Sequence, residues 1–121
     1  MKKITLLLAL SFAIAATGSA QAGKKGAQQT VTIQTPTVQC ESCKKRIESY
    51  MSREDGVKKV VVDYKRKTTK VTFVSDRTNI ENIKTAIANV GYDADDVTAN
   101  EETYKKLPTC CKKTEDGGGK H

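Results

Sequence analysis

The chain has 121 residues, of which 37% are hydrophobic and 29% are charged, and it contains no Trp. This length fits one small domain with appendages, and the composition is too polar for a bundle of membrane-spanning helices. The formal net charge is +7, but no aromatic residues interleave the basic clusters, so the stacking surface of a single-strand nucleic-acid binder is missing and we expect no nucleic-acid partner.

Residues 1–22 are typical of a signal peptide. Two lysines follow the first Met, residues 4–16 are apolar, and residues 20–22 (AQA) have the small-x-small pattern of a cleavage site. The apolar run is shorter than the about 20 residues that span a membrane, and a short uncleaved anchor is the alternative. We expect an exported protein, periplasmic or extracellular. Its mature form should not span a membrane and should begin with a flexible leader at residues 23–29.

The next segment predicts a strand and then an amphipathic helix. Residues 30–35 (TVTIQT) alternate polar and apolar side chains as a half-buried strand does, and Pro36 ends the strand. From Ser42 the period changes to that of a helix, which residues 54–56 (EDG) close. The apolar face of this helix consists of Cys43, Ile47, Tyr50 and Met51.

A β-hairpin and a second helix follow. Residues 60–64 and 71–73 alternate as two strands around a turn at residues 65–68. Thr78 and Glu81 have the spacing of a capping box that opens a helix. The buried stripe of this helix consists of Ile80, Ile83, Ile87 and Val90, and Gly91 ends it.

A final strand would complete the order of elements of a split-βαβ fold. With a short final strand at residues 96–99, the order is β-α-β-β-α-β, the split-βαβ pattern. The sequence thus predicts an α+β, ferredoxin-like fold for residues 30–99, with two helices on one face of a four-stranded antiparallel sheet. Residues 100–121 are a C-terminal extension, with a stub helix at residues 101–107 and a disordered tail from Lys112.

The four cysteines occur as two close pairs, Cys40 with Cys43 and Cys110 with Cys111. An even number of cysteines in an exported chain would ordinarily suggest a disulfide framework. Pairs so close in the sequence would close only tiny loops, which stabilise a fold little. We therefore expect these cysteines to bind something.

Cys40-Glu41-Ser42-Cys43 lies where a loop meets the start of the first predicted helix. A helix N-terminus presents unpaired N–H groups and a partial positive charge, which stabilise the thiolate, and the thiolate is the form that binds metal. The spacing puts both sulfurs on one side of the turn, so they can hold one ion in a linear or bent site. Soft sulfur ligands favour Cu(I), Zn(II) and other thiophilic ions.

Three cations, Lys44, Lys45 and Arg46, follow in the first helical turn. They oppose the helix dipole, and a local rule broken beside two cysteines indicates function. They could lower the thiolate pKa or face an acidic docking partner. The alternative is a solvated helix face without a special role.

Residues 30–98 resemble the heavy-metal-associated domain of copper chaperones, metal-pumping ATPases and periplasmic mercury-binding proteins. The segments that carry the resemblance are VQCESCKKRIE, GVKKVVVDY, KVTF and IKTAIANVGYD. The resemblance implies that Cys40 and Cys43 are metal ligands and that Tyr92 packs near the metal loop. It also implies that Val38 takes the place of the Met that usually tethers this loop.

Our leading prediction is a metal carrier without catalysis. It would hold one thiophilic ion, with Cu(I) or Hg(II) favoured and Zn(II) or Cd(II) possible. The ion would pass by thiolate exchange to a membrane metal transporter or another Cys-containing acceptor. A CxxC motif at a helix start also serves redox chemistry, so a thiol–disulfide oxidoreductase is one alternative, and a structural domain with an oxidised Cys40–Cys43 bond is another.

Cys110 and Cys111 have no counterpart in the minimal domain that the chain resembles. They could form a strained disulfide, stay idle, or join the first pair in a four-sulfur site, which would suit Zn(II). His121 follows three glycines at the chain end, and we expect it to be a bystander.

Overall fold

The computed structural model describes residues 27–118, so the expected signal peptide, most of the expected leader and His121 lie outside the described residues. Gln28 and Gln29, expected in the leader, already belong to the first strand. The elements are β1 (Gln28–Gln34), α1 (Glu41–Met51), β2 (Val57–Asp63), β3 (Thr68–Val74), α2 (Ile80–Val90) and α3 (Glu101–Lys105), followed by the 3-10 helices η1 (Thr109–Cys111) and η2 (Thr114–Asp116). None of the described helices is long and apolar enough to cross a membrane.

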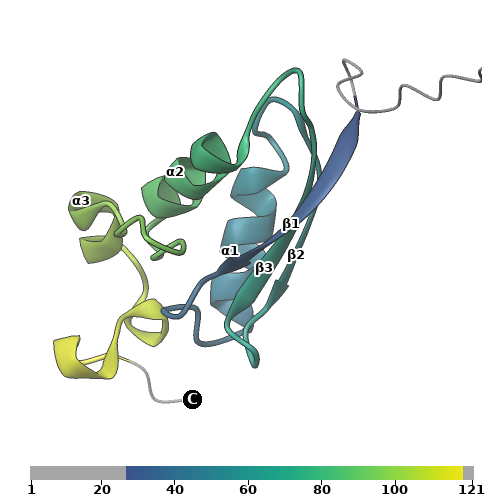
Figure 1. The fold of residues 1–121 in the computed structure, drawn as a ribbon. Coiled ribbons are helices and arrows are strands. Elements are labelled where there is room, and N and C mark those ends of the chain that lie inside the picture. The colour runs from purple at the N-terminus through teal and green to yellow at the C-terminus, as the bar shows by residue number, and fades with distance from the viewer. Residues whose placement is uncertain (1–26, 119–121) are drawn as a thin grey trace, which may run out of the picture.

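The strands form an antiparallel sheet in the order β1-β3-β2. Because side chains alternate along a strand, one face carries polar residues such as Thr30, Lys70 and Thr72, and the other face is apolar. Figure 1 shows α1 and α2 on the same side of this sheet, as the sequence predicts. They cover its apolar face, which is formed by Ile33, Val62, Val71 and Phe73.

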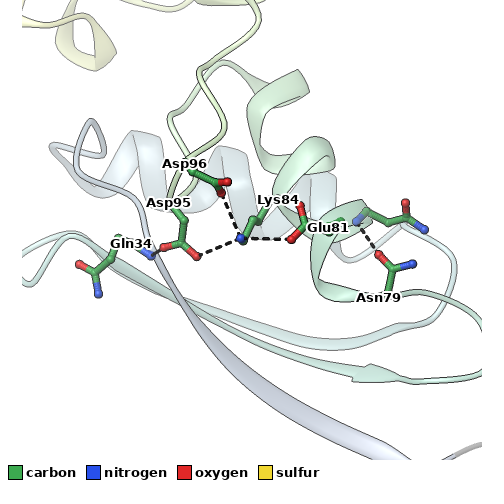
Figure 2. Close-up of polar contacts among 7 residues, drawn as sticks. Gln34, Asn79, Glu81, Lys84, Asp95 and Asp96 are labelled. Carbon is green, nitrogen blue, oxygen red and sulfur yellow. Dashed lines mark hydrogen bonds and ion pairs between the residues drawn. The ribbon is translucent and has the colours of Figure 1, made fainter.

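The described part of the chain has three strands, so the prediction of a fourth strand at residues 96–99 is wrong. The N–H groups of Ala94 and Val97 each donate to the carbonyl of the other around a tight turn. Asp95 lies in this turn with a φ of 50°. Its amide donates to the Gln34 carbonyl at 2.8 Å, and its carboxylate accepts from the Gln34 amide at 2.6 Å (Figure 2). The hydrogen-bonding groups of Gln34 at the end of β1 are therefore paired by a turn, where a strand was expected.

The second helix begins one residue later than the capping box predicts. Its N-cap is Asn79, whose side chain accepts from the Asn82 amide at 2.8 Å. Thr78 instead closes the preceding turn, because its amide donates to the Val74 carbonyl. The predicted end at Gly91 is confirmed, with a φ of 112° in the left-handed region that glycine tolerates best.

The C-terminal extension packs onto the domain. Leu107 is buried in the core, and a Cβ at Gly91 would come within 3.1 Å of its side chain. The Asn100 amide donates to the Ala88 carbonyl at 2.8 Å. The tail expected to be disordered is ordered as far as Gly118 and contains η2, since the Lys113 amide donates to the Tyr104 hydroxyl. The extension therefore continues the domain and lies beside the loop before α1 (Figure 1).

Candidate metal centre

The structure brings the two cysteine pairs together in one cluster of free thiols. The sulfurs of Cys40 and Cys43 lie 3.5 Å apart, and those of Cys110 and Cys111 lie 3.9 Å apart. The Sγ atoms of Cys43 and Cys111, 68 positions apart in the sequence, are separated by 2.7 Å. Those of Cys40, Cys110 and Cys111 all lie within 4.8 Å of one another. Cys111 thus joins the two pairs into one site.

The cluster has a buried end and an accessible end. Cys43 and Cys111 are fully buried, whereas Cys40 and Cys110 are half-buried. Cys40 is the N-cap of α1 with extended backbone, and its side chain does not cap the helix. Cys43 lies one turn later on the face that packs into the core. An ion could therefore enter from the side of Cys40 and Cys110.

The pKa values of Cys40, at the accessible end, and Cys111, at the buried end, shift in opposite directions. Burial by itself would raise the pKa of Cys40, but the neighbouring Cys43 amide and thiol, Cys110 thiol and Ser42 amide hold that pKa below its ordinary value. Burial raises the pKa of Cys111, and its contact with Cys43 raises it further. Cys40 therefore presents a thiolate more readily than Cys111 does.

Tyr92 lies at the buried end, near the metal loop as expected. It is fully buried, and within the described part of the chain its hydroxyl has no partner in hydrogen-bonding geometry. Burial and then the neighbouring Cys111 and Cys43 thiols raise the pKa of Tyr92. The phenol therefore stays protonated and places an unused O–H donor beside two sulfurs. The resemblance predicted the position of this side chain, while its unpaired hydroxyl is visible only in the structure.

The loop that carries Cys40 is held from both sides. Val38 is fully buried in the core, and its carbonyl accepts from the Lys67 ammonium in the β2–β3 turn. The Gln39 side chain donates to the Lys112 carbonyl of the C-terminal extension. Sequence reasoning missed this last contact, because nothing local to Gln39 points to a residue 73 positions away.

The three cations after the motif take different positions. Lys44 pairs with Glu48 at 2.8 Å and donates to the Val62 carbonyl at 3.1 Å, so it ties α1 to β2. The groups that lower the pKa of Cys40 are neighbouring amides and thiols, and an effect of Lys44, Lys45 and Arg46 on thiolate acidity stays a prediction. Lys45 and Arg46 are exposed, and their side chains remain available to a partner.

Comparison with known proteins places residues 30–93 in the profile of the heavy-metal-associated domain. A mercuric transport protein periplasmic component from Shigella flexneri is 32% identical over 92 residues, which cover 76% of this chain and 93% of that protein. Oxidized MerP from Ralstonia metallidurans CH34 is a similar solved structure, with a TM-score of 0.54 and 32% identity over 56% of this chain and 94% of that chain.

A second solved structure is the mercury-bound form of MerP, the periplasmic protein of the bacterial mercury detoxification system. It has a TM-score of 0.51 and 30% identity over 57% of this chain and 96% of that one. The family match ends at residue 93. Cys40 and Cys43 therefore lie inside the shared region, and Cys110 and Cys111 lie outside it.

Proposed function

The chain belongs to the heavy-metal-associated domain family, and from this premise we propose that it is a carrier of one thiophilic metal ion that Cys40 and Cys43 bind. The observation that supports this most directly is the 3.5 Å separation of their sulfurs at the N-terminus of α1. Both sulfurs can reach one ion with only small side-chain movements. The carrier has no catalytic role.

The chemistry of the pair fits soft ions. The lowered pKa of Cys40 favours its thiolate, and backbone amides at the helix start stabilise the negative charge. Thiolate ligands select Cu(I), Hg(II), Zn(II) and Cd(II) over hard cations such as Mg²⁺. Two sulfurs alone suit the low coordination numbers of Cu(I) and Hg(II), which are the favoured cargo.

The ion leaves by ligand exchange. A thiolate of the acceptor attacks the bound ion before either bond to the carrier breaks, so the ion is never released to water. The acceptor is a membrane metal transporter or another Cys-containing protein, and the site of action is the periplasm after export by the signal peptide. Relatives named as periplasmic transport components support this placement.

Lys45 and Arg46 steer the acceptor to the site. They are exposed in the turn that carries Cys43, where they would attract an acidic surface. We expect Lys45→Glu/Arg46→Glu to slow metal transfer to a dithiol peptide with acidic flanks and to leave metal affinity unchanged. An unchanged transfer rate at low ionic strength would exclude this docking role.

The test of the carrier is native mass spectrometry of the reduced chain without residues 1–22, titrated with Cu(I), Hg(II) and Zn(II). We expect one ion per chain, lost in Cys40→Ser/Cys43→Ser and kept in the control Ser42→Ala, which changes the same loop without removing a sulfur. Unchanged stoichiometry in the double variant would contradict the proposal. Turnover in an insulin-reduction assay would instead support the redox alternative.

A further inference from the structure

We propose that Cys110 and Cys111 of the C-terminal extension complete a four-thiolate site, so that this chain holds one Zn(II) or Cd(II) ion in tetrahedral coordination. This inference rests on the proposed function, because it requires Cys40 and Cys43 to be ligands. It goes further by adding two ligands from outside the region that the family shares, and these change the coordination number and the class of ion preferred.

The sulfur separation within each cysteine pair is close to that around a tetrahedral ion. Metal–sulfur bonds of about 2.3 Å in a tetrahedron put neighbouring sulfurs about 3.8 Å apart. The distances within the two pairs, 3.5 Å for Cys40 and Cys43 and 3.9 Å for Cys110 and Cys111, lie on either side of this value. The 2.7 Å between Cys43 and Cys111 must widen by about 1 Å. The sulfurs of Cys40, Cys110 and Cys111 already lie within 4.8 Å of one another, so the Cys43 side chain is the one that must rotate to complete the site.

The extension holds its cysteines at the site in the metal-free fold. Leu107, three residues before Cys110, is buried against Gly91. On the other side of the pair, the Lys112 carbonyl accepts from Gln39. The Cys40 thiol also points to the Cys110 carbonyl at 3.9 Å. Ligands that are already in place lose little conformational entropy on binding, so the third and fourth sulfurs bind at small cost.

The surroundings can compensate the charge of the loaded site. Four thiols that bind one divalent ion release four protons and leave a complex of net charge −2. Buried charge of this kind requires hydrogen-bond donors. The Ser42 and Cys43 amides lie in the first turn of α1, directly after its N-cap Cys40, and the Tyr92 hydroxyl lies beside Cys43 and Cys111. Among residues 27–118 this hydroxyl has no acceptor in hydrogen-bonding geometry, and a metal-bound thiolate would supply one.

The test counts sulfurs around Zn(II) by X-ray absorption in the reduced chain without residues 1–22. We expect four sulfurs in this chain and in the control Thr109→Ser, which alters η1 without removing a thiol. We expect two sulfurs in Cys110→Ser/Cys111→Ser. Zn(II) affinity, measured by competition with a chelator, should fall in this variant by more than the about 10- to 100-fold that loss of an outer hydrogen-bond partner costs.

The outcomes separate this inference from the proposed function. Two sulfurs around Zn(II) in the unsubstituted chain, with unchanged affinity in the Cys110→Ser/Cys111→Ser variant, would overturn the four-thiolate site and leave the two-thiolate carrier intact. Failure of the unsubstituted chain to bind Cu(I), Hg(II) or Zn(II) would overturn both. If the double variant does not fold, Cys110→Ser at a half-buried position replaces it. A fall from four sulfurs in the unsubstituted chain to three in this variant supports the site, while a count of two, or a count that the substitution leaves unchanged, refutes the role of Cys110.

Discussion

At the scale of single residues, the site combines one activated thiol with one unused donor. Cys40 lies at the accessible end and has a lowered pKa, so in the proposed carrier it would make the first bond to an ion. Tyr92 lies at the buried end with its hydroxyl unpaired. An unsatisfied buried hydroxyl destabilises a fold, and its position against the sulfurs indicates that it serves the loaded form.

Tyr92→Phe should therefore lower metal affinity without lowering the stability of the fold. Without metal, we expect stability to stay the same or to rise by up to about 1–3 kcal/mol, because the variant removes an unsatisfied buried group. Zn(II) affinity should fall about tenfold or more, since a donor to a bound thiolate is lost. Chemical unfolding and chelator competition measure the two effects. Tyr64→Phe, in a partly buried tyrosine after β2, is the control, and lower metal-free stability with unchanged affinity would contradict this role.

At the scale of elements, the helix termini decide where the chain turns towards the site. α1 begins at Cys40 and so places both motif sulfurs at its N-terminus. α2 ends at Gly91, whose left-handed backbone turns the chain so that Tyr92 enters the core. The capping of α2 depends on Asn79 rather than on Thr78.

Two neighbouring substitutions test this capping. Asn79→Ala removes the acceptor for the Asn82 amide, and we expect it to lower the free energy of unfolding by about 1 kcal/mol. Thr78→Ala should lower it less, because the Thr78 side chain does not cap the helix in the structure. Urea unfolding of both variants measures the difference. A larger loss for Thr78→Ala would restore the capping box that the sequence predicts.

Lys84 links α2 to the turn that lies where a fourth strand was predicted. Its ammonium donates to Asp96 at 3.1 Å and to Glu81 at 3.4 Å, and it pairs with Asp95 at 3.8 Å (Figure 2). The hydrogen bond with Lys84 lowers the pKa of Asp96, and the same bond raises the pKa of Lys84. Asp96 and Glu81 are largely exposed, so the contribution to stability is modest.

The sign of the pH dependence follows from the lowered pKa of Asp96. Its contribution is present at neutral pH, above the pKa of the unfolded chain, and is lost as the pH falls through the lower folded pKa. We expect Asp96→Asn to reduce the loss of stability between neutral and acidic pH. Unfolding measured across this range tests the effect, with Asp76→Asn in the exposed turn after β3 as the matched control. Equal acid profiles for Asp96→Asn and the unsubstituted chain would exclude this linkage.

At the scale of the whole molecule, the extension is packed as part of the domain. Leu107 and Cys111 belong to the same buried cluster as Ile47 of α1 and Ile87 of α2. The segment that bears Cys110 and Cys111 therefore depends on core packing, which links the metal site to the stability of the extension.

Leu107→Ala should destabilise the C-terminal extension more than it destabilises the sheet. Loss of a buried leucine side chain costs roughly 2–5 kcal/mol, and here the loss falls on a segment that can open locally. We expect faster hydrogen exchange in residues 101–118 than in β3, together with weaker Zn(II) binding. Leu107→Met, which conserves volume, should cost less than about 1.5 kcal/mol. Unchanged exchange in the extension with uniformly faster exchange in the sheet would contradict this account.

Local sequence patterns were enough to predict α1, α2 and the β2–β3 hairpin and to propose Cys40 and Cys43 as ligands. Periodicity located both helices and the hairpin, and the CxxC at a helix start identified Cys40 and Cys43, because helix and strand patterns depend on residues only a few positions apart. Only the fold shows that Cys111 lies against Cys43, that the Tyr92 hydroxyl has no partner within the described part of the chain, and that a turn closes the end of β1. These features depend on contacts between residues tens of positions apart, such as Leu107 against Gly91 and Asp95 against Gln34, and no local pattern encodes which distant surface a segment will meet.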